Sequence, residues 1–87
     1  MVSKRVTVIT ETGLHLKPAA LFSREACKYE SLITFTHDNT TANAKSILSI
    51  LGACVRKGDE IEIVCSGVDE EEALAGMCRA VESGLEE

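Results

Sequence analysis

The sequence lacks any long hydrophobic run. No apolar stretch approaches the roughly 18 consecutive positions that a membrane-spanning helix needs. The N-terminal residues MVSKRVTVITETG alternate in polarity, without the apolar core or small-residue cleavage site of a secretory signal. Linkers, internal repeats and low-complexity segments are also missing. We therefore expect a single domain over residues 1–87 that is located in the cytoplasm and does not insert into a membrane.

Cysteine pairs and the common nucleotide-binding and catalytic motifs are missing as well. The four cysteines show no CxxC spacing, and each lies in an otherwise apolar segment: Cys27, Cys54, Cys65 and Cys78. We expect them to be reduced packing residues, with disulfides or metal ligands as the less favoured alternative. The sequence contains no Walker loop, GxGxxG sequence, Ser-His-Asp set or Cys–His cluster. It thus predicts no cofactor and no metal ion.

Charge is present but unevenly placed. The net charge of −5 divides into +4 over residues 1–58 and −9 over residues 59–87. An acidic chain is a poor nucleic-acid binder overall, so we expect no direct nucleic-acid partner. The basic N-terminal part could nevertheless offer a positive surface to an acidic protein.

The polarity pattern changes between the period of strands and the period of helices along the chain. Alternation around Val6 and Val8 is typical of a strand, Pro18 suits the first turn of a helix, and Asp69 with Glu72 resembles a capping box. The expected elements are a strand over Val2–Ile9, a helix over Leu16–Tyr29, a hairpin of Leu32–Thr36 and Thr40–Asn43, a short helix after Ser46 that breaks near Gly52, a strand over Glu60–Cys65 and a helix from Asp69 to Gly84.

Each expected helix and strand has an apolar side that must be buried. The stripe of the first helix contains Ala19, Phe22, Ala26 and Tyr29, and that of the last contains Leu74, Met77, Cys78, Val81 and Leu85. The economical arrangement is an α+β fold, an open-faced β-sandwich in which three helices cover one face of a four-stranded antiparallel sheet. The predicted element order is β-α-β-β-α-β-α.

The segment TGLHLKPAA places His15 directly before the first expected helix. Backbone amides at a helix start lack partners, and the helix dipole adds about half a positive charge there. This position disfavours an imidazolium and keeps a nitrogen lone pair available, while it favours a bound phosphate. We therefore consider His15 a candidate phosphoryl acceptor. The alternative is that His15 serves as an ordinary helix cap.

Two further surfaces could dock a protein. On the first helix, the face opposite the core carries Leu16, Lys17, Ala20, Leu21, Arg24 and Lys28. A basic rim around exposed leucines fits an acidic-rimmed partner, although a merely solvated basic face is the alternative. The short helix ILSILG is too apolar to be buried on all sides, so some of Ile47, Leu48 and Leu51 should be exposed.

Ser46, directly before the short helix, has two interpretations. The first is a helix N-cap, and the second is a phosphorylation site beside a docking patch, where a phosphate would interact favourably with the helix dipole. For His37, at the end of the expected second strand, a surface or turn role is favoured.

TGLHLKPAA together with NAKSILSILGACVRKGDEIEIVCSGVDEEEAL resembles the HPr family, the histidine-containing phosphocarriers of the bacterial sugar phosphotransferase system. The resemblance implies that His15 takes a phosphoryl group on Nδ1 from phosphorylated enzyme I and passes it to the IIA component of a sugar permease. It implies that Ser46 is modified by an ATP-dependent kinase/phosphorylase and that the modified form is a co-repressor of a LacI-type repressor. It also implies a docking surface of Lys45, Ile47, Leu48 and Leu51.

The sequence departs from the family pattern beside His15. Lys17 stands where the family usually has arginine, which keeps the charge and loses the planar fork of donors for phosphate. Leu16 is bulkier than the usual small residue, which could alter docking to enzyme I. These departures leave a second hypothesis, an HPr-like regulatory module that acts mainly through Ser46 in carbon catabolite control, with weak or absent sugar phosphotransfer.

Overall fold

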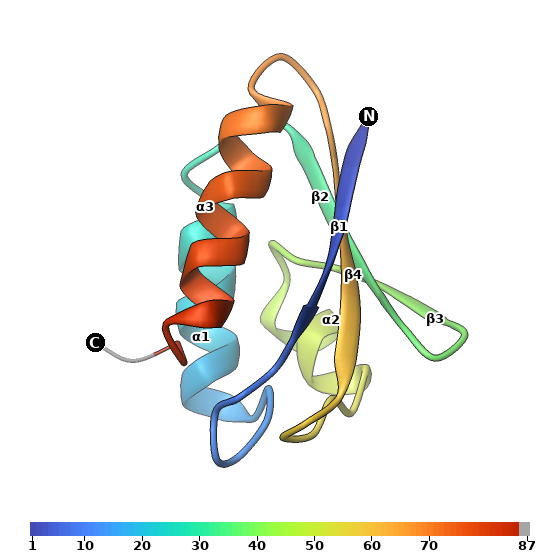
Figure 1. Cartoon of the computed structure of the whole chain (residues 1–87), viewed down its shortest axis with the longest axis vertical. Coiled ribbons are helices and arrows are strands. Elements are labelled where there is room, and N and C mark those ends of the chain that lie inside the picture. The colour runs from blue at the N-terminus through green and yellow to red at the C-terminus, as the bar shows by residue number, and fades with distance from the viewer. Residues whose placement is uncertain (86–87) are drawn as a thin grey trace.

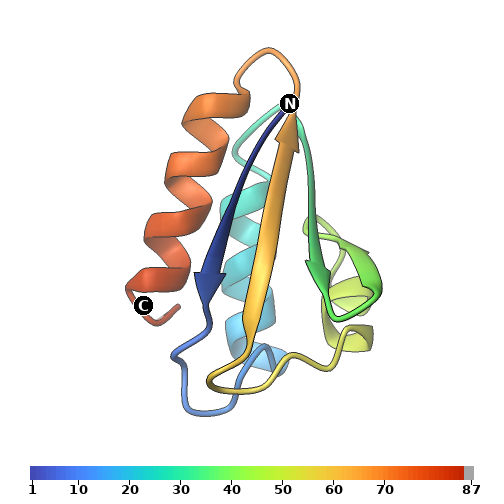
Figure 2. The same cartoon turned by 45° about the vertical axis from the view of Figure 1, so that its right-hand side comes forward.

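The computed structural model describes residues 1–85 as one four-stranded antiparallel sheet with three helices on one face (Figure 1). The elements are β1 (Val2–Thr7), α1 (Leu16–Ala26), β2 (Leu32–His37), β3 (Thr40–Asn43), α2 (Ile47–Gly52), β4 (Glu60–Ser66) and α3 (Glu70–Glu82). The strand order is β1-β4-β2-β3. Figure 2 shows β1, β4 and β2 side by side in front of α1. The predicted element order and fold class are confirmed.

Two elements are shorter than predicted. β1 ends at Thr7 rather than Ile9, because the next residue, Val8, bonds with the loop before β4: its N–H donates to the Asp59 carbonyl at 2.9 Å, and its carbonyl accepts the Gly58 N–H at 2.7 Å. α1 ends at Ala26 rather than Tyr29, because the backbone tightens there to bonds between residues three apart. The Tyr29 N–H, for example, donates to the Ala26 carbonyl.

The core lies between the sheet and the helices. Phe22 of α1 meets Phe35 of β2 edge to face, with ring centroids 5.3 Å apart. The predicted inward residues of β4 are fully buried: Ile61, Ile63 and Cys65. Glu60 and Glu62 lie on the open face of the sheet, as the alternation in β4 predicts, and Val64 and the 63% exposed Leu32 lie on the same face. Because the core lies between the sheet and the helices, the helix starts and the connecting loops lie at its edges, where functional side chains can be exposed.

The cysteines divide into two pairs. Cys65 and Cys78 are buried, as expected of packing residues, and burial raises the pKa of the Cys65 thiol to about 11 and that of Cys78 in the same direction. Cys27 and Cys54 are exposed, so the packing role predicted for them is wrong. Cys27 follows the end of α1, and Cys54 follows α2 with a left-handed φ of 55° that points its side chain away from the core. All four thiols are free.

Tyr29 fastens the end of α1 to α3. Its hydroxyl donates to the Glu25 carboxylate at 2.8 Å, and its ring lies against Gly76 of α3. A Cβ on Gly76 would overlap the Tyr29 hydroxyl and lie 2.8 Å from ring atom Cζ. Glycine in a helix costs about 1 kcal/mol relative to alanine. Here the absence of a side chain at Gly76 allows the Tyr29 ring to pack closely against α3, which offsets that cost.

The start of α3 corrects the predicted capping box. Asp69 occupies the N-cap position, but its side chain makes no cap hydrogen bond. The Asp69 carboxylate instead accepts the backbone N–H groups of Glu30 and Ser31, each at 2.9 Å, on the turn before β2. At this helix start it is the Glu70 carboxylate that accepts a backbone N–H, from Gly67 at 3.1 Å. The predicted end at Gly84 is close to the observed one, with Ser83 as the C-cap.

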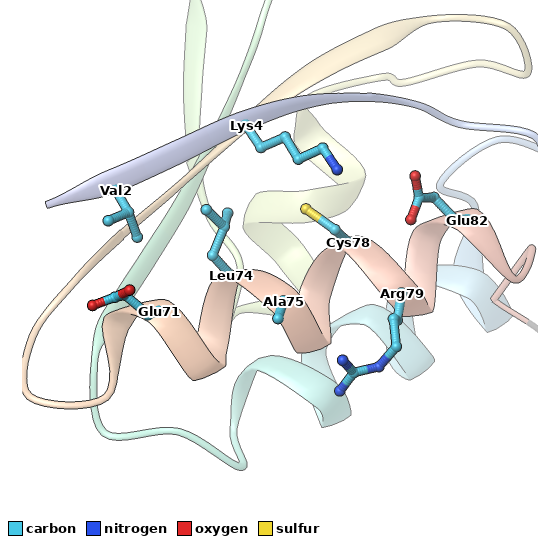
Figure 3. A pocket seen from close by; sticks show the side chains of 8 residues that line it. All are labelled: Val2, Lys4, Glu71, Leu74, Ala75, Cys78, Arg79 and Glu82. Atoms are coloured by element: carbon cyan, nitrogen blue, oxygen red, sulfur yellow. The ribbon is translucent and has the colours of Figure 1, made fainter.

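A groove of about 420 Å³ lies between β1 and α3 (Figure 3). Figure 3 shows Lys4 extending above Cys78 toward Glu82, with Leu74 and Val2 at the other end. The groove contains neither His15 nor Ser46. Among residues 1–85, no helix is both long enough and apolar enough to cross a membrane.

Candidate functional site

His15 is the N-cap residue of α1. Its backbone is extended, with φ −86° and ψ −170°, and its carbonyl accepts the Ala19 N–H at 2.7 Å. The side chain is exposed and makes no cap hydrogen bond, so the interpretation of His15 as an ordinary side-chain cap is not supported. Proline has no N–H, and Pro18 is the third helical residue, so the N–H groups of the first turn belong to Leu16 and Lys17. An exposed imidazole thus stands beside two amides at a positive helix end.

The segment before His15 is held by the loop between α2 and β4. The Leu14 N–H donates to the Val55 carbonyl at 3.0 Å, and the Leu14 side chain is buried. Gly13 has a φ of 66°, and a Cβ there would overlap the Val55 carbonyl oxygen and lie 2.7 Å from the Arg56 Cα. Both figures show the β1–α1 loop and the α2–β4 loop at the same, lower end of the molecule. Only glycine allows this approach.

An ion pair joins the same two loops at the surface. Lys57 Nζ lies 2.7 Å from Glu11 Oε1, and this contact lowers the pKa of Glu11. Both side chains are largely exposed, so solvent screens the pair and it stabilises the loops only weakly. The backbone contacts of Gly13 and Leu14 are therefore the main constraint on the position of His15.

The face of α1 next to His15 is basic and partly apolar, as predicted. Leu16 is 62% exposed, and the side chains of Lys17, Arg24 and Lys28 are also exposed. Ala20 and Leu21 are half-buried, and Leu21 packs against the core. Lys28, in the turn after α1, is paired with Glu25 of α1 at 2.9 Å. Leu16 is therefore the main exposed apolar side chain of this face.

Ser46 is the N-cap of α2, in agreement with the first of its two interpretations. Its hydroxyl oxygen accepts the Ser49 N–H at 3.2 Å, and its carbonyl accepts the Ile50 N–H at 3.0 Å. The Ser49 hydroxyl in turn accepts the Asn43 N–H at 2.8 Å, which ties α2 to the end of β3. The Ser46 side chain is half-buried, at the border between the helix and the solvent.

The apolar residues of α2 divide as the sequence analysis expected. Leu48 is 83% exposed and Ile47 39% exposed, whereas Leu51 packs partly against the core. Lys45 differs from these residues, because its ammonium donates to the Tyr29 carbonyl at 2.6 Å and its charge is held on the turn after α1. α1 contacts α2 directly, so the predicted docking residues lie on these two adjoining helices or, for Lys28 and Lys45, in the turns next to them.

His37 has a structural role that the sequence analysis missed. Its ring is only 11% exposed, so the surface or turn role predicted for it is wrong. The ring instead connects the end of β2 to the loop between α2 and β4, through the Ala53 carbonyl and the Asp59 carboxylate. The partners lie 16 and 22 residues away, so no local pattern could have revealed them.

Among residues 1–85, no three histidine, cysteine or carboxylate side chains are grouped to hold a metal ion.

The fold and the site together define a small open-faced β-sandwich that exposes one histidine at a helix start and has an apolar and basic face beside it. Comparisons with known proteins give the class more narrowly. Residues 2–83 match the family model described as PTS HPr component phosphorylation site. The chain therefore belongs to the HPr family of the phosphotransferase system, as the resemblance predicted.

The relatives and solved structures agree with this assignment. Phosphocarrier protein HPr of Treponema pallidum (strain Nichols) is 37% identical over 87 residues, which covers 100% of this chain and 99% of that protein. HPr-like protein Crh of Bacillus subtilis (strain 168) is 38% identical over 82 residues, 94% of this chain and 96% of that protein. The crystal structure of HPr-C-His from Thermoanaerobacter tengcongensis is similar with a TM-score of 0.94 and 39% identity, covering 100% and 99% of the two chains.

This membership sets the general role. HPr proteins are phosphocarriers and not classical enzymes, and they work with other components of the phosphotransferase system. The relatives include both HPr and Crh at similar identity, so the division between sugar transport and regulation is a question for the particular residues of this chain.

Proposed function

We propose that this protein is a phosphocarrier in which His15 accepts a phosphoryl group from phosphorylated enzyme I and passes it to the IIA component of a sugar permease. The observation that carries the proposal is the exposed His15 ring at the N-cap of α1, without a side-chain hydrogen bond and next to the N–H groups of Leu16 and Lys17. The protein works as a stoichiometric phosphohistidine intermediate that turns over only with its partners, in the cytoplasm.

The transfer exchanges one P–N bond for another. The Nδ1 lone pair of neutral His15, with the proton on Nε2, attacks the phosphorus of the donor phosphohistidine, whose other ring nitrogen carries a proton. The bond between phosphorus and the donor nitrogen breaks, so the donor leaves as a neutral imidazole and phosphorylated His15 keeps its Nε2 proton. The electron pair of that bond returns to the donor imidazole, so neither water nor a metal ion is consumed. Transfer to a IIA histidine is the same exchange with His15 as the leaving group.

The start of α1 provides the charge that the phosphoryl group needs. Its oxygens can accept the N–H groups of Leu16 and Lys17, which point out of the helix end with the positive end of the dipole. The Lys17 ammonium adds a flexible point charge. Because Pro18 contributes no N–H, two amides rather than three serve the phosphate.

Enzyme I and the IIA proteins would dock on α1 and α2. The exposed apolar residues Leu16, Ile47 and Leu48 would provide the centre of this surface, with the half-buried Ala20, Leu21 and Leu51 beside them. The basic residues Lys17, Arg24, Lys28 and Lys45 favour acidic rims on the partners. Both partners must reach His15, so one shared surface is the economical arrangement.

Ser46 would regulate this docking. A phosphate on its hydroxyl would lie at the α2 start beside exposed Ile47 and Leu48, where added negative charge repels acidic-rimmed partners. An ATP-dependent kinase/phosphorylase would add and remove it, and a LacI-type repressor would recognise the modified form. The cap contact of Ser46 supports retention of α2, because anions at a helix start are favourable.

The second candidate is an HPr-like regulatory module that acts mainly through Ser46. It is favoured by the 38% identity to Crh, whose solution structure is described as that of the Bacillus subtilis catabolite repression HPr. Lys17 in place of the usual arginine also favours this candidate, because lysine lacks the planar fork of donors for phosphate. The exposed, uncapped His15 favours the carrier.

The deciding experiment is incubation with phosphoenolpyruvate and enzyme I, followed by intact mass and an acid-lability test. The carrier function predicts a gain of one phosphoryl group that acid removes and that His15→Ala abolishes. Absence of transfer to the intact protein would overturn it and leave the regulatory module. For Ser46, kinase and ATP should give an acid-stable adduct. Equal labelling of Ser46→Ala would show that another residue is modified.

A further inference from the structure

His37 has both ring nitrogens in hydrogen bonds to groups that line the same surface hollow as the ring. Nδ1 lies 2.9 Å from the Ala53 carbonyl oxygen, and Nε2 lies 2.9 Å from Asp59 Oδ2. The hollow holds about 430 Å³ and is lined by these residues with Asp38, Thr40, Cys54 and Arg56. His37 thus joins the end of β2 to both ends of the loop over residues 53–59, named here the 53–59 loop.

Both partners of the ring only accept hydrogen bonds. A carbonyl oxygen has no proton, and the Arg56 backbone N–H together with the His37 ring holds the pKa of Asp59 below its usual range, so Asp59 is a carboxylate. A neutral imidazole carries a single N–H and can make one of these bonds at a time. The two contacts are hydrogen bonds at the same time only when the ring donates from both nitrogens.

Asp59 extends this connection to three strands. Its Oδ2 also accepts the Arg56 N–H at 3.0 Å, and its carbonyl accepts the Val8 N–H at the end of β1 at 2.9 Å. The ends of β1 and β2 and the start of β4 are thus bonded through one residue. Asp38 also faces the ring, but its carboxylate lies 3.9 Å from Nε2 and is 88% exposed, so it makes a much weaker contact.

The 53–59 loop is the same loop that holds the segment before His15. Leu14 donates to the Val55 carbonyl, and Gly13 packs against Val55 and Arg56, between the two points that His37 fixes. The loop also contains Cys54 in the left-handed region, a conformation that costs a residue other than glycine about 1–2 kcal/mol. A loop with this local cost keeps its shape only if contacts on both sides hold it.

We propose that His37 and Asp59 are positioning residues for phosphoryl transfer, which fix the 53–59 loop and through Val55 set the place of Leu14 and His15. Neither residue touches the phosphoryl group. The inference rests on the proposed function only where it concerns transfer, because the position of Leu14 can be measured without a partner.

The first test uses Asp59→Asn with Asp38→Asn as the matched control, since both remove one carboxylate charge near the ring. Amide hydrogen exchange would be followed at Leu14 and at the β2–β4 amides. Asp59→Asn should lower the protection of the Leu14 amide roughly three- to tenfold, the factor that one hydrogen bond supplies. Asp38→Asn should change it less than about twofold. Equal protection of Leu14 in the two variants overturns the inference, and equal loss at β2–β4 shows general destabilisation instead and equally overturns it.

The second test uses His37→Gln. Protection of the Leu14 amide, corrected for the intrinsic exchange rate, should fall, because the substitution removes the two ring contacts that hold the 53–59 loop. Protection equal to that of the unsubstituted protein would exclude His37 as a source of this constraint.

The third test measures transfer from phosphorylated enzyme I. Asp59→Asn should reduce kcat roughly threefold or more, while KM stays within about twofold, because the docking residues of α1 and α2 are untouched. Asp38→Asn should leave both unchanged. If the unsubstituted protein accepts no phosphoryl group, the proposed function fails while the Leu14 measurements stand. If transfer proceeds and Asp59→Asn keeps full kcat, the positioning role is the part that fails.

Discussion

The Asp69 carboxylate accepts the Ser31 backbone N–H at 2.9 Å and also accepts the Ser31 hydroxyl. The Glu30 N–H donates to the same carboxylate. These bonds hold the pKa of Asp69 below its usual range; the Ser31 hydroxyl has the largest effect and the Glu30 N–H the next largest. A side chain at the start of α3 thereby fixes the turn that leads into β2, at the end of the molecule opposite His15.

This contact predicts a loss of stability in acid. The pKa of Asp69 is lower in the folded than in the unfolded chain, so its contribution is complete above the unfolded value, near 4, and declines as the pH falls through the folded value. Asp69→Asn should therefore destabilise the protein at pH 7 and flatten the acid side of its stability profile. Urea unfolding between pH 2 and 7 measures both effects. A profile of unchanged shape in the variant would assign the acid dependence to other carboxylates.

Gly13→Ala should be strongly destabilising, because alanine meets both a left-handed φ and the Val55 backbone. We expect the free energy of unfolding to fall by about 2–4 kcal/mol. Gly58→Ala is the matched control: Gly58 has a φ of 91° with nothing within 4 Å of a Cβ, so it carries the conformational cost alone, about 1 kcal/mol. Denaturant unfolding of the two variants separates these contributions. Equal losses would mean that the β1–α1 loop moves away from Val55 without cost.

Ser46→Ala should lower the free energy of unfolding by about 1 kcal/mol, because the Ser49 N–H loses the hydroxyl that accepts it. Ser46→Asp should retain most of the stability, since aspartate is a comparable cap and its charge suits a helix start. Ser83→Ala, which removes a hydroxyl bonded to the Ala80 carbonyl at the end of α3, provides the comparison. Should Ser46→Asp be the less stable of the two Ser46 variants, the favourable interaction of an anion with α2 would be refuted.

Lys17→Arg should increase the rate of phosphoryl transfer to His15 about severalfold, because a planar guanidinium can make two hydrogen bonds with phosphate oxygens where an ammonium acts as a point charge. Lys28→Arg makes the same exchange about three helical turns further along, in the turn after α1, and should leave the rate unchanged. Both rates can be measured by quenching the transfer from phosphorylated enzyme I at successive times and determining the phosphorylated fraction by mass spectrometry. No change with Lys17→Arg would mean that the fork geometry is unimportant here.

Elements whose pattern is local could be predicted from the sequence. The alternation in β4 identified Ile61, Ile63 and Cys65 as buried, and Ser46 before an apolar run identified the start of α2. The position of His15 at the α1 start followed in the same way. In each case the signal lies within a few residues of the feature, and the hydrophobic period determines the outcome.

Contacts between distant segments could not be predicted. Asp69 has the sequence context of a cap, yet its carboxylate bonds to a turn 38 residues earlier. The His37 ring is hydrogen-bonded to the carboxylate of Asp59, 22 residues later in the chain. The apolar stripe of α1 continues to Tyr29 although the helix ends at Ala26, because Tyr29 still packs on α3 and so preserves the period. Periodicity reports which side chains are covered and leaves open whether the backbone beneath them is still helical.

The contact of Tyr29 with Gly76 has an optical consequence. The chain has no tryptophan and one tyrosine, so Tyr29 provides nearly all of its absorbance at 280 nm and its intrinsic fluorescence. Burial and the hydrogen bond to Glu25 raise the pKa of its hydroxyl to about 12, and the ring senses the junction of α1 and α3. A fluorescence trace of unfolding therefore records the separation of those two helices, whereas events at His15 need an isotope or mass label to be seen.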